Sequence, residues 1–226
     1  QTGRPKCRHV QVGDMSIEVV PRDGTVKYLG RMICFEHPHN AEIDHRINVA
    51  WKRFMCLRDE LTNKKYPLHS RLRLFDRTVS ASLLYGCEVW VLTQELANKL
   101  QRTQRKMVRM IVGTKRRITC QGTESATSSA SSSGVVPDSD GEAETFLEPW
   151  VEWIKRATRE AEERARKLNI RDWISAHEEA AARWLQKMES GEASWACRVF
   201  MWEPHENVRR PSGPRRRWVD ATRSFT

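Results

Sequence analysis

Five basic residues recur every three or four positions between residues 99 and 109, a spacing that aligns them along one side of a helix. These residues, the basic ridge, are Lys99, Arg102, Arg105, Lys106 and Arg109. At about 100° per residue, the basic ridge lies roughly 130° from the apolar residues of the same segment. This pattern favours contact with nucleic-acid phosphates, although a solvated helix face would show the same spacing.

Further basic residues lie in three short stretches outside the basic ridge. The candidate nucleic-acid-binding residues there are Lys27, Tyr28, Gly30, Arg31, Arg116, Arg117, Arg215, Arg216 and Arg217. In the first stretch the glycine permits close approach of another backbone, and the tyrosine ring could meet a sugar or a base. A strand-end glycine beside a half-buried tyrosine is the alternative. The last stretch precedes Trp218, a candidate stacking platform.

Two other groups of residues have the types, but not the spacing, of a reactive or metal-binding site. Cys87, with Glu88 and Trp90 nearby, has no histidine placed beside it by the sequence, so we predict packing and no nucleophile. The segment Cys34-x-x-His37-x-His39 matches no closed zinc pattern, and we predict a polar loop. The sequence therefore predicts no catalytic residue, no metal site and no cofactor.

Composition favours an anionic partner and a chain that is folded only in part. The 226 residues include 39 Lys and Arg against 29 Asp and Glu, a formal charge of +10. A 39% share of hydrophobic residues supports modest cores but not one compact globule of this length. No window approaches ~18 consecutive apolar residues and no signal peptide is recognisable, so no membrane contact is expected. The six cysteines form no disulfide pattern, which indicates an intracellular chain.

The periodicity predicts a mainly α fold with a short N-terminal β-hairpin or meander within residues 10–36. From residue 41, apolar residues at alternating steps of four and three predict a helix that reaches Leu61. A second helix begins after Pro67 and ends near Gly86, and a third follows the N-cap residue Thr93 and stops at Gly113. We expect these three helices to form a bundle.

The next segment changes character, because it is rich in serine and acids and contains no Lys or Arg. We predict a disordered linker over 119–148 and a second, separately folded helical unit after it. The predicted parts of the chain are 1–40 (hairpin), 41–118 (helical bundle), 119–148 (linker), 149–203 (second helical unit) and 204–226 (basic tail).

Several strings in this chain resemble non-LTR retrotransposon reverse transcriptases, in the region just after the polymerase palm. They are KYLGR at 27–31, HRINVAWKRF at 45–54, LRLFDRTVSASLLYGCEVWVLT at 72–93 and LQRTQRKMVRMIVG at 100–113. LLYGCEVW is the most telling of them. The strings WISAHEEAAARW at 173–184 and RRPSGPRRRWVD at 209–220 are similar to the segment that follows the thumb in the same elements.

The resemblance implies that residues 1–40 hold the end of the palm, including the primer-gripping strands around Tyr28 and Gly30, and that 41–118 form the thumb. Polymerases of this family need two adjacent aspartates and a further carboxylate to hold two Mg²⁺ ions. This chain contains no Asp-Asp pair. The fingers and the catalytic palm would precede residue 1.

We therefore predict a non-catalytic fragment of a reverse transcriptase that binds an RNA–DNA or DNA duplex with little sequence preference. Two alternatives stay open. One is a helical protein-interaction module or a decayed copy without function, and the other is a part of an active polymerase whose palm and fingers lie upstream or on another chain. The resemblance implies that the missing palm and fingers are partners, and that the protein acts in the nucleus.

Overall fold

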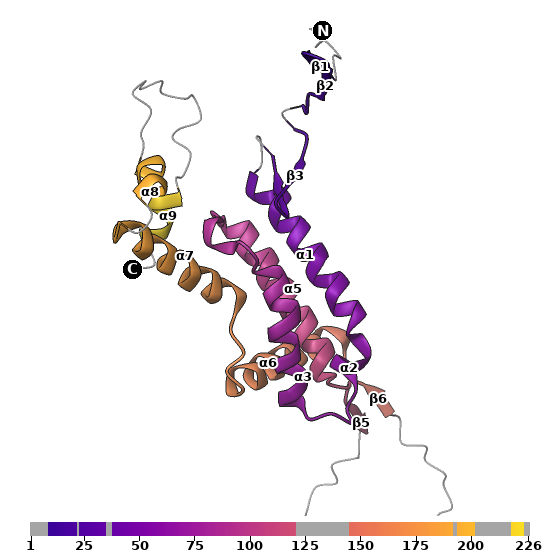
Figure 1. Ribbon diagram of the computed structural model, residues 1–226. Helices are drawn as coiled ribbons and strands as arrows, with labels where there is room; N and C mark the ends of the chain where they lie inside the picture. Colours follow the sequence, from indigo (N-terminus) through magenta and orange to yellow (C-terminus); the bar gives the residue numbers. More distant parts are fainter. Residues whose placement is uncertain are drawn as a thin grey trace, which may run out of the picture.

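The computed structural model describes six stretches of the chain, and every structural statement below concerns these residues. They are residues 9–21, 23–34, 38–120, 145–191, 194–201 and 218–223. The fold is mainly helical, as predicted, with short strands at the N-terminal end (Figure 1). The predicted contacts of Arg215, Arg216 and Arg217 lie outside the described residues, as does 121–144 of the predicted linker.

The N-terminal strands form two antiparallel hairpins. Strand β1 (His9–Val12) pairs with β2 (Met15–Glu18), and β3 (Val26–Tyr28) pairs with β4 (Arg31–Ile33). In the second hairpin, Leu29 and Gly30 form a two-residue turn with φ values of 47° and 79°. Positive φ at both turn positions matches the natural twist of the two strands, and glycine reaches this region without strain.

Helix α1 (Pro38–Cys56) carries the apolar stripe that the spacing predicted. Ile43, Ala50 and Phe54 on this stripe are fully buried, whereas the residues between them include many that are exposed. A short helix, α2 (Arg58–Thr62), follows and buries Leu61.

The predicted second helix is a continuous helical run with a wider turn in its middle. It consists of α3 (Leu68–Phe75), the π-helical turn η1 (Asp76–Ser80) and α4 (Ala81–Leu83). Pro67 precedes its first turn, and Gly86, with φ 69°, follows its last. A π-helical turn changes the direction of the side chains that follow it, and such turns are frequent at functional sites. The 3-10 turn η2 (Cys87–Val89) comes next.

Helix α5 (Gln94–Val112) begins and ends where the sequence predicted. The Thr93 hydroxyl accepts a hydrogen bond from the backbone N–H of Leu96, which caps the first turn. Gly113, with φ 63°, ends the helix in the left-handed conformation that favours glycine.

The predicted linker begins and ends in ordered residues. Strand β5 (Ile118–Cys120) pairs antiparallel with β6 (Thr145–Leu147), so that Cys120 faces Thr145. Glu148 accepts hydrogen bonds from the side chains of Arg116 and Arg156, which fix the chain after β6. The predicted linker of 119–148 thus includes, at each end, residues that belong to these paired strands.

The helices after the linker are not a separate unit, which corrects the predicted domain division. Helix α6 (Trp150–Lys167) packs along α5, and α7 (Trp173–Glu189) begins inside the same core. The ring of Trp173 stacks on Phe75 at 6.0 Å between centroids, and its Nε1 donates to the Ser80 hydroxyl. Helices α8 (Ser194–Met201) and α9 (Trp218–Thr222) pack on α7.

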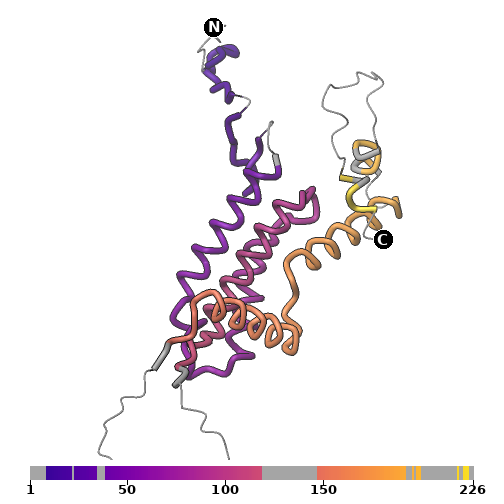
Figure 2. The backbone as a smooth tube through the Cα atoms, turned by 180° about the vertical axis from the view of Figure 1, so that it is seen from behind, coloured from indigo at the N-terminus to yellow at the C-terminus, as the bar shows by residue number. Residues whose placement is uncertain are grey.

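Figures 1 and 2 show α1 and α5 side by side, with α6 crossing them near the end that carries β5 and β6. The hairpin β1–β2 extends away from the bundle in both views. None of the described helices combines the length and the apolar character that crossing a membrane requires.

Candidate nucleic-acid interface

The β3–β4 hairpin is fixed to α1 by a buried carboxylate. Glu42 is fully buried and accepts hydrogen bonds from the Met32 backbone N–H at 2.6 Å and from Arg46 Nε at 2.7 Å. Arg46 Nη2 also donates to the Gly30 carbonyl at 2.6 Å, and its guanidinium lies over the Tyr85 ring. The hairpin tip is thus held against the start of the bundle by a charge-assisted network.

The residues predicted at this hairpin lie close together in its strands and turn, where Lys27 and Tyr28 are exposed and Gly30 and Arg31 are partly buried. The Tyr28 side chain is 61% exposed, so the alternative of a half-buried ring is wrong. Lys27 is also exposed, and Arg31 lies 3.9 Å from the Glu42 carboxylate. Gly30 is required by its positive φ, and a Cβ built there would lie 3.7 Å from Tyr85 Cε1.

A groove of about 420 Å³ lies between α1 and the η1–α4 run, next to this hairpin. This α1–η1 groove is lined by Arg46, Val49, Arg53, Arg77, Thr78, Ala81, Ser82 and Tyr85. Three of the lining residues are arginines, none is acidic, and the Tyr85 ring is 55% exposed. Within the described residues, neither Arg53 nor Arg77 forms an ion pair, and both are exposed. Their charges are available to an anion.

The sequence prediction missed Arg53, Arg77 and Tyr85. All three lie in the strings 45–54 and 72–93, but each helix was described only by its apolar stripe. The signal that could have found them is a basic or aromatic residue on the polar side of each of two neighbouring helices.

Helix α6 contacts two of the five residues of the basic ridge. Arg105 forms an ion pair with Glu162, and Arg109 Nη1 donates to the Thr158 hydroxyl at 2.8 Å. Burial lowers the pKa of Arg109 from its usual value, which reflects partial loss of water around its guanidinium. Arg105 and Arg109 thus join α5 to α6, and this use of their N–H groups weakens the case for phosphate contacts by these two residues.

The remaining residues of the ridge differ in their surroundings. Lys99 forms an ion pair with Asp44 of α1, and Lys106 lies 5.3 Å from the centre of the Trp51 ring. Arg102 is exposed and forms no ion pair within the described residues. Among the described residues, Arg102 and Lys106 are thus the two ridge residues whose side chains have no ion pair or hydrogen bond.

The two candidate residues after α5, Arg116 and Arg117, also differ in whether their side chains are bonded inside the protein. The Arg116 side chain donates to the Glu148 backbone carbonyl at 2.9 Å, whereas the Arg117 side chain is exposed. The hydrogen bonds from Arg156 and from the Arg117 backbone N–H lower the pKa of Glu148 to about 2. Arg116 is thus a structural residue, and Arg117 remains a candidate for phosphate contact.

The structure places Cys87 in the core, as predicted. Burial raises the pKa of the Cys87 thiol to about 11, so that it stays protonated and weakly nucleophilic. A histidine that the sequence did not place, His177, contacts the Cys87 carbonyl through Nδ1 at 2.8 Å. His177 also stacks on the Trp90 ring.

The exposed platform suggested for Trp218 is wrong. Its ring is 8% exposed, packs with Leu185 and Met188, and donates from Nε1 to the Glu88 carbonyl. In the second cysteine motif, Cys34 is buried and His39 accepts from the Val91 backbone N–H at 3.4 Å. His37 lies outside the described residues.

A stretch of 89 residues, 38% of this chain, is 34% identical to a Caenorhabditis elegans protein described as an uncharacterized transposon-derived protein. The matched stretch covers 30% of the length of that relative. The similarity is consistent with a transposable-element origin for this chain. No family model matches the sequence, and no solved structure matches it significantly.

Proposed function

We propose that this chain is the thumb and C-terminal part of a non-LTR retrotransposon reverse transcriptase, and that it binds a template–primer duplex without catalysing synthesis. The similarity to a transposon-derived protein supports the origin. The family strings supply the finer assignment to a thumb. The nucleus remains the proposed site of action.

The α1–η1 groove is the observation that carries the binding proposal. The groove lining contains no acidic residue, and although Arg46 is paired with Glu42, Arg53 and Arg77 keep charges that attract an anion. The exposed rings of Tyr28 and Tyr85 lie at the hairpin end, where a ribose or base could stack. Phosphate contacts of this kind position a duplex without reading its sequence, which agrees with sequence-tolerant binding.

The binding test removes two groove charges without adding acids. The variant Arg53→Gln/Arg77→Gln should bind a fluorescein-labelled primed RNA–DNA duplex about tenfold more weakly than the wild-type chain. The slope of log affinity against log salt concentration should be smaller in magnitude by about two, which is about one for each lost phosphate contact. Fluorescence anisotropy at several salt concentrations measures both quantities.

A matched control separates the groove from net charge. The variant Lys187→Gln/Arg198→Gln loses the same two charges from exposed positions on α7 and α8, and should bind like the wild-type chain. Equal affinity of the groove variant and this control would reject the proposal. Circular dichroism of both variants confirms that the helices are intact.

The absence of catalysis is proposed from the missing Asp-Asp pair. A primer-extension assay with the 226-residue chain, a primed RNA template and Mg²⁺ should give no extended product. Template-dependent extension by the pure chain would contradict this part of the proposal.

A second candidate function, a part of a larger polymerase, is favoured by the β1–β2 hairpin. Val10 and Ile17 face each other across this hairpin, as do Val12 and Met15, and all four side chains are about half exposed or more. An isolated two-stranded hairpin is marginally stable in water, so this one fits an element that a neighbouring sheet covers. Hydrogen exchange should show fast exchange of the amides of 9–18 in the isolated chain. Slowing on addition of a separately expressed palm and fingers would support this candidate.

A further inference from the structure

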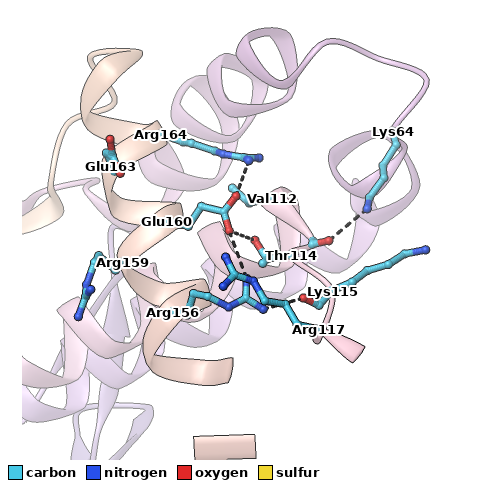
Figure 3. Close-up of a pocket in the computed structure, with 11 residues that line it drawn as sticks. Lys64, Val112, Thr114, Lys115, Arg117, Arg156, Arg159, Glu160, Glu163 and Arg164 are labelled. Carbon is cyan, nitrogen blue, oxygen red and sulfur yellow. Dashed lines mark hydrogen bonds and ion pairs between the residues drawn. The ribbon is translucent and has the colours of Figure 1, made fainter. Parts of the chain in front are cut away.

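A basic cleft, distinct from the α1–η1 groove, lies at the C-terminal end of α5, beside α6. The cleft has a volume of about 490 Å³ and is bounded by the end of α5, the loop before α3 and one side of α6 (Figure 3). Six of its eleven lining residues are Lys or Arg and two are Glu, which gives the lining a formal charge of +4. No residue of the α1–η1 groove contributes to it.

The two glutamates of the cleft already have cationic partners. Glu160 accepts from the Thr114 hydroxyl at 2.9 Å and forms an ion pair with Arg164, as Figure 3 shows. Glu163 forms an ion pair with Lys167 on the same helix at 2.8 Å. These contacts neutralise both carboxylates, and the pairing of Glu160 uses the charge of Arg164, which also lines the cleft.

Three other cations keep their charge without a carboxylate partner among the described residues. Lys115, Arg117 and Arg159 are exposed, and none of them forms an ion pair there. Lys64 donates to the Gly113 carbonyl at 3.1 Å, which leaves its other two N–H groups free. In Figure 3 the Lys64 and Lys115 side chains extend on the same side of the loop that follows α5.

The remaining lining favours phosphate over a base. No aromatic residue lines the cleft, and Val112 is its one large apolar lining residue, so a base would find no ring to stack on. Arginine and lysine side chains supply the forked and single N–H donors that phosphate oxygens accept.

We propose that this cleft is a phosphate-binding site, separate from the α1–η1 groove, which binds the phosphates of a nucleic-acid backbone or of a small polyphosphate. Lys115 and Arg117 are its main contacts, with Lys64 and Arg159 at its edges. The site does not distinguish one base from another.

The test compares two variants that lose equal charge. The cleft variant Lys115→Gln/Arg117→Gln and the groove variant Arg53→Gln/Arg77→Gln are titrated with inorganic tripolyphosphate by isothermal calorimetry at low salt. The cleft variant should lose about tenfold or more in affinity, whereas the groove variant should keep the wild-type value. Among the described residues, these four side chains form no hydrogen bond or ion pair, so both variants should unfold at the wild-type temperature.

One further ligand, single-stranded RNA, identifies the source of the phosphate. A weaker affinity of the cleft variant for single-stranded RNA, with a shallower salt slope, assigns the site to a nucleic-acid backbone. Unchanged RNA binding, with tripolyphosphate binding lost, assigns it to a small polyphosphate.

Equal tripolyphosphate affinity of the cleft variant and the wild-type chain would overturn the proposal. So would equally tight binding of an octaglutamate peptide, because that result would show a general acidic-peptide site. Either outcome leaves the duplex-binding proposal for the groove untouched, since that proposal depends on Arg53 and Arg77.

Discussion

Arg109 acts inside the protein, although its position in the sequence suggests a surface contact. Replacing it by Ala removes the hydrogen bond to Thr158 on α6 and should lower the free energy of unfolding by about 1–2 kcal/mol. Urea denaturation monitored by circular dichroism measures this loss. Arg102→Ala, at an exposed position of the same helix, should change stability by less than about 0.5 kcal/mol. Equal effects of the two substitutions would contradict the role of Arg109 between α5 and α6.

His177 should make the protein less stable in mild acid. Burial lowers the pKa of its imidazole below the ordinary 6.5, and the Cys87 carbonyl, which can only accept, fixes the proton on Nδ1 of the neutral ring. The unfolded chain therefore binds a proton that the folded chain does not. Stability from this residue is complete above about pH 6.5 and falls as the pH drops toward the folded pKa.

The measurement is urea denaturation at pH 7.5 and pH 5.5 for the wild-type chain and His177→Gln. Gln can still donate to the Cys87 carbonyl but does not titrate. The wild-type chain should lose more stability between these pH values than the variant does. The same loss in both proteins would assign the pH dependence to other groups, such as His39, whose pKa burial also lowers.

At the scale of elements, local signals predicted where helices begin and end. Thr93 and Gly113 bound α5 as expected, because a cap hydroxyl and a left-handed glycine act within one turn of the chain. Periodicity says which residues share a face, but not which element covers that face. Arg105 contacts Glu162 of α6, which lies 57 residues later in the chain. The spacing of the basic residues within α5 therefore could not predict that α6 packs against them.

The π-helical turn η1 is a second feature that the pattern did not reveal. The apolar residues Phe75, Val79 and Leu83 keep a regular spacing of four and are all fully buried. That regularity is compatible with an ordinary helix. The wider turn changes the hydrogen bonding of the backbone, which a hydrophobic pattern does not record.

Ser80 connects this helical run to the start of α7. Its hydroxyl accepts from Trp173 Nε1 at 2.8 Å in the core, so Ser80→Ala would leave a buried donor unpaired and cost about 1–3 kcal/mol. Ser82→Ala is the matched control, because the partly exposed Ser82 hydroxyl donates to the Thr78 carbonyl of its own helical run and, within the described part of the chain, to nothing else. Thermal unfolding of both variants should show a clear loss for Ser80→Ala alone. A neutral Ser80→Ala would mean that Trp173 does not rely on this contact.

At the scale of the whole molecule, the helices before and after the predicted linker share one hydrophobic core. Ala161 of α6 and Trp173 of α7 are buried among residues of α1, α3 and α5. We therefore expect helix content and tryptophan fluorescence to follow one unfolding curve in urea. A chain that ends at Glu148 should lose this cooperative transition, since the face of α5 that α6 covers would be open to water. A truncated chain that unfolds at the wild-type midpoint would restore the division into two units.

The paired strands β5 and β6 have a consequence for how this chain can change over generations. Cys120 and Thr145 face each other across the ribbon, so the two chain ends that enclose 121–144 are already neighbours. Each doubling of the length between two such ends costs only about 0.6 kcal/mol in closure entropy. Insertions and deletions at this place are therefore nearly neutral for the fold, and homologues of this chain should differ in length mainly between these two residues.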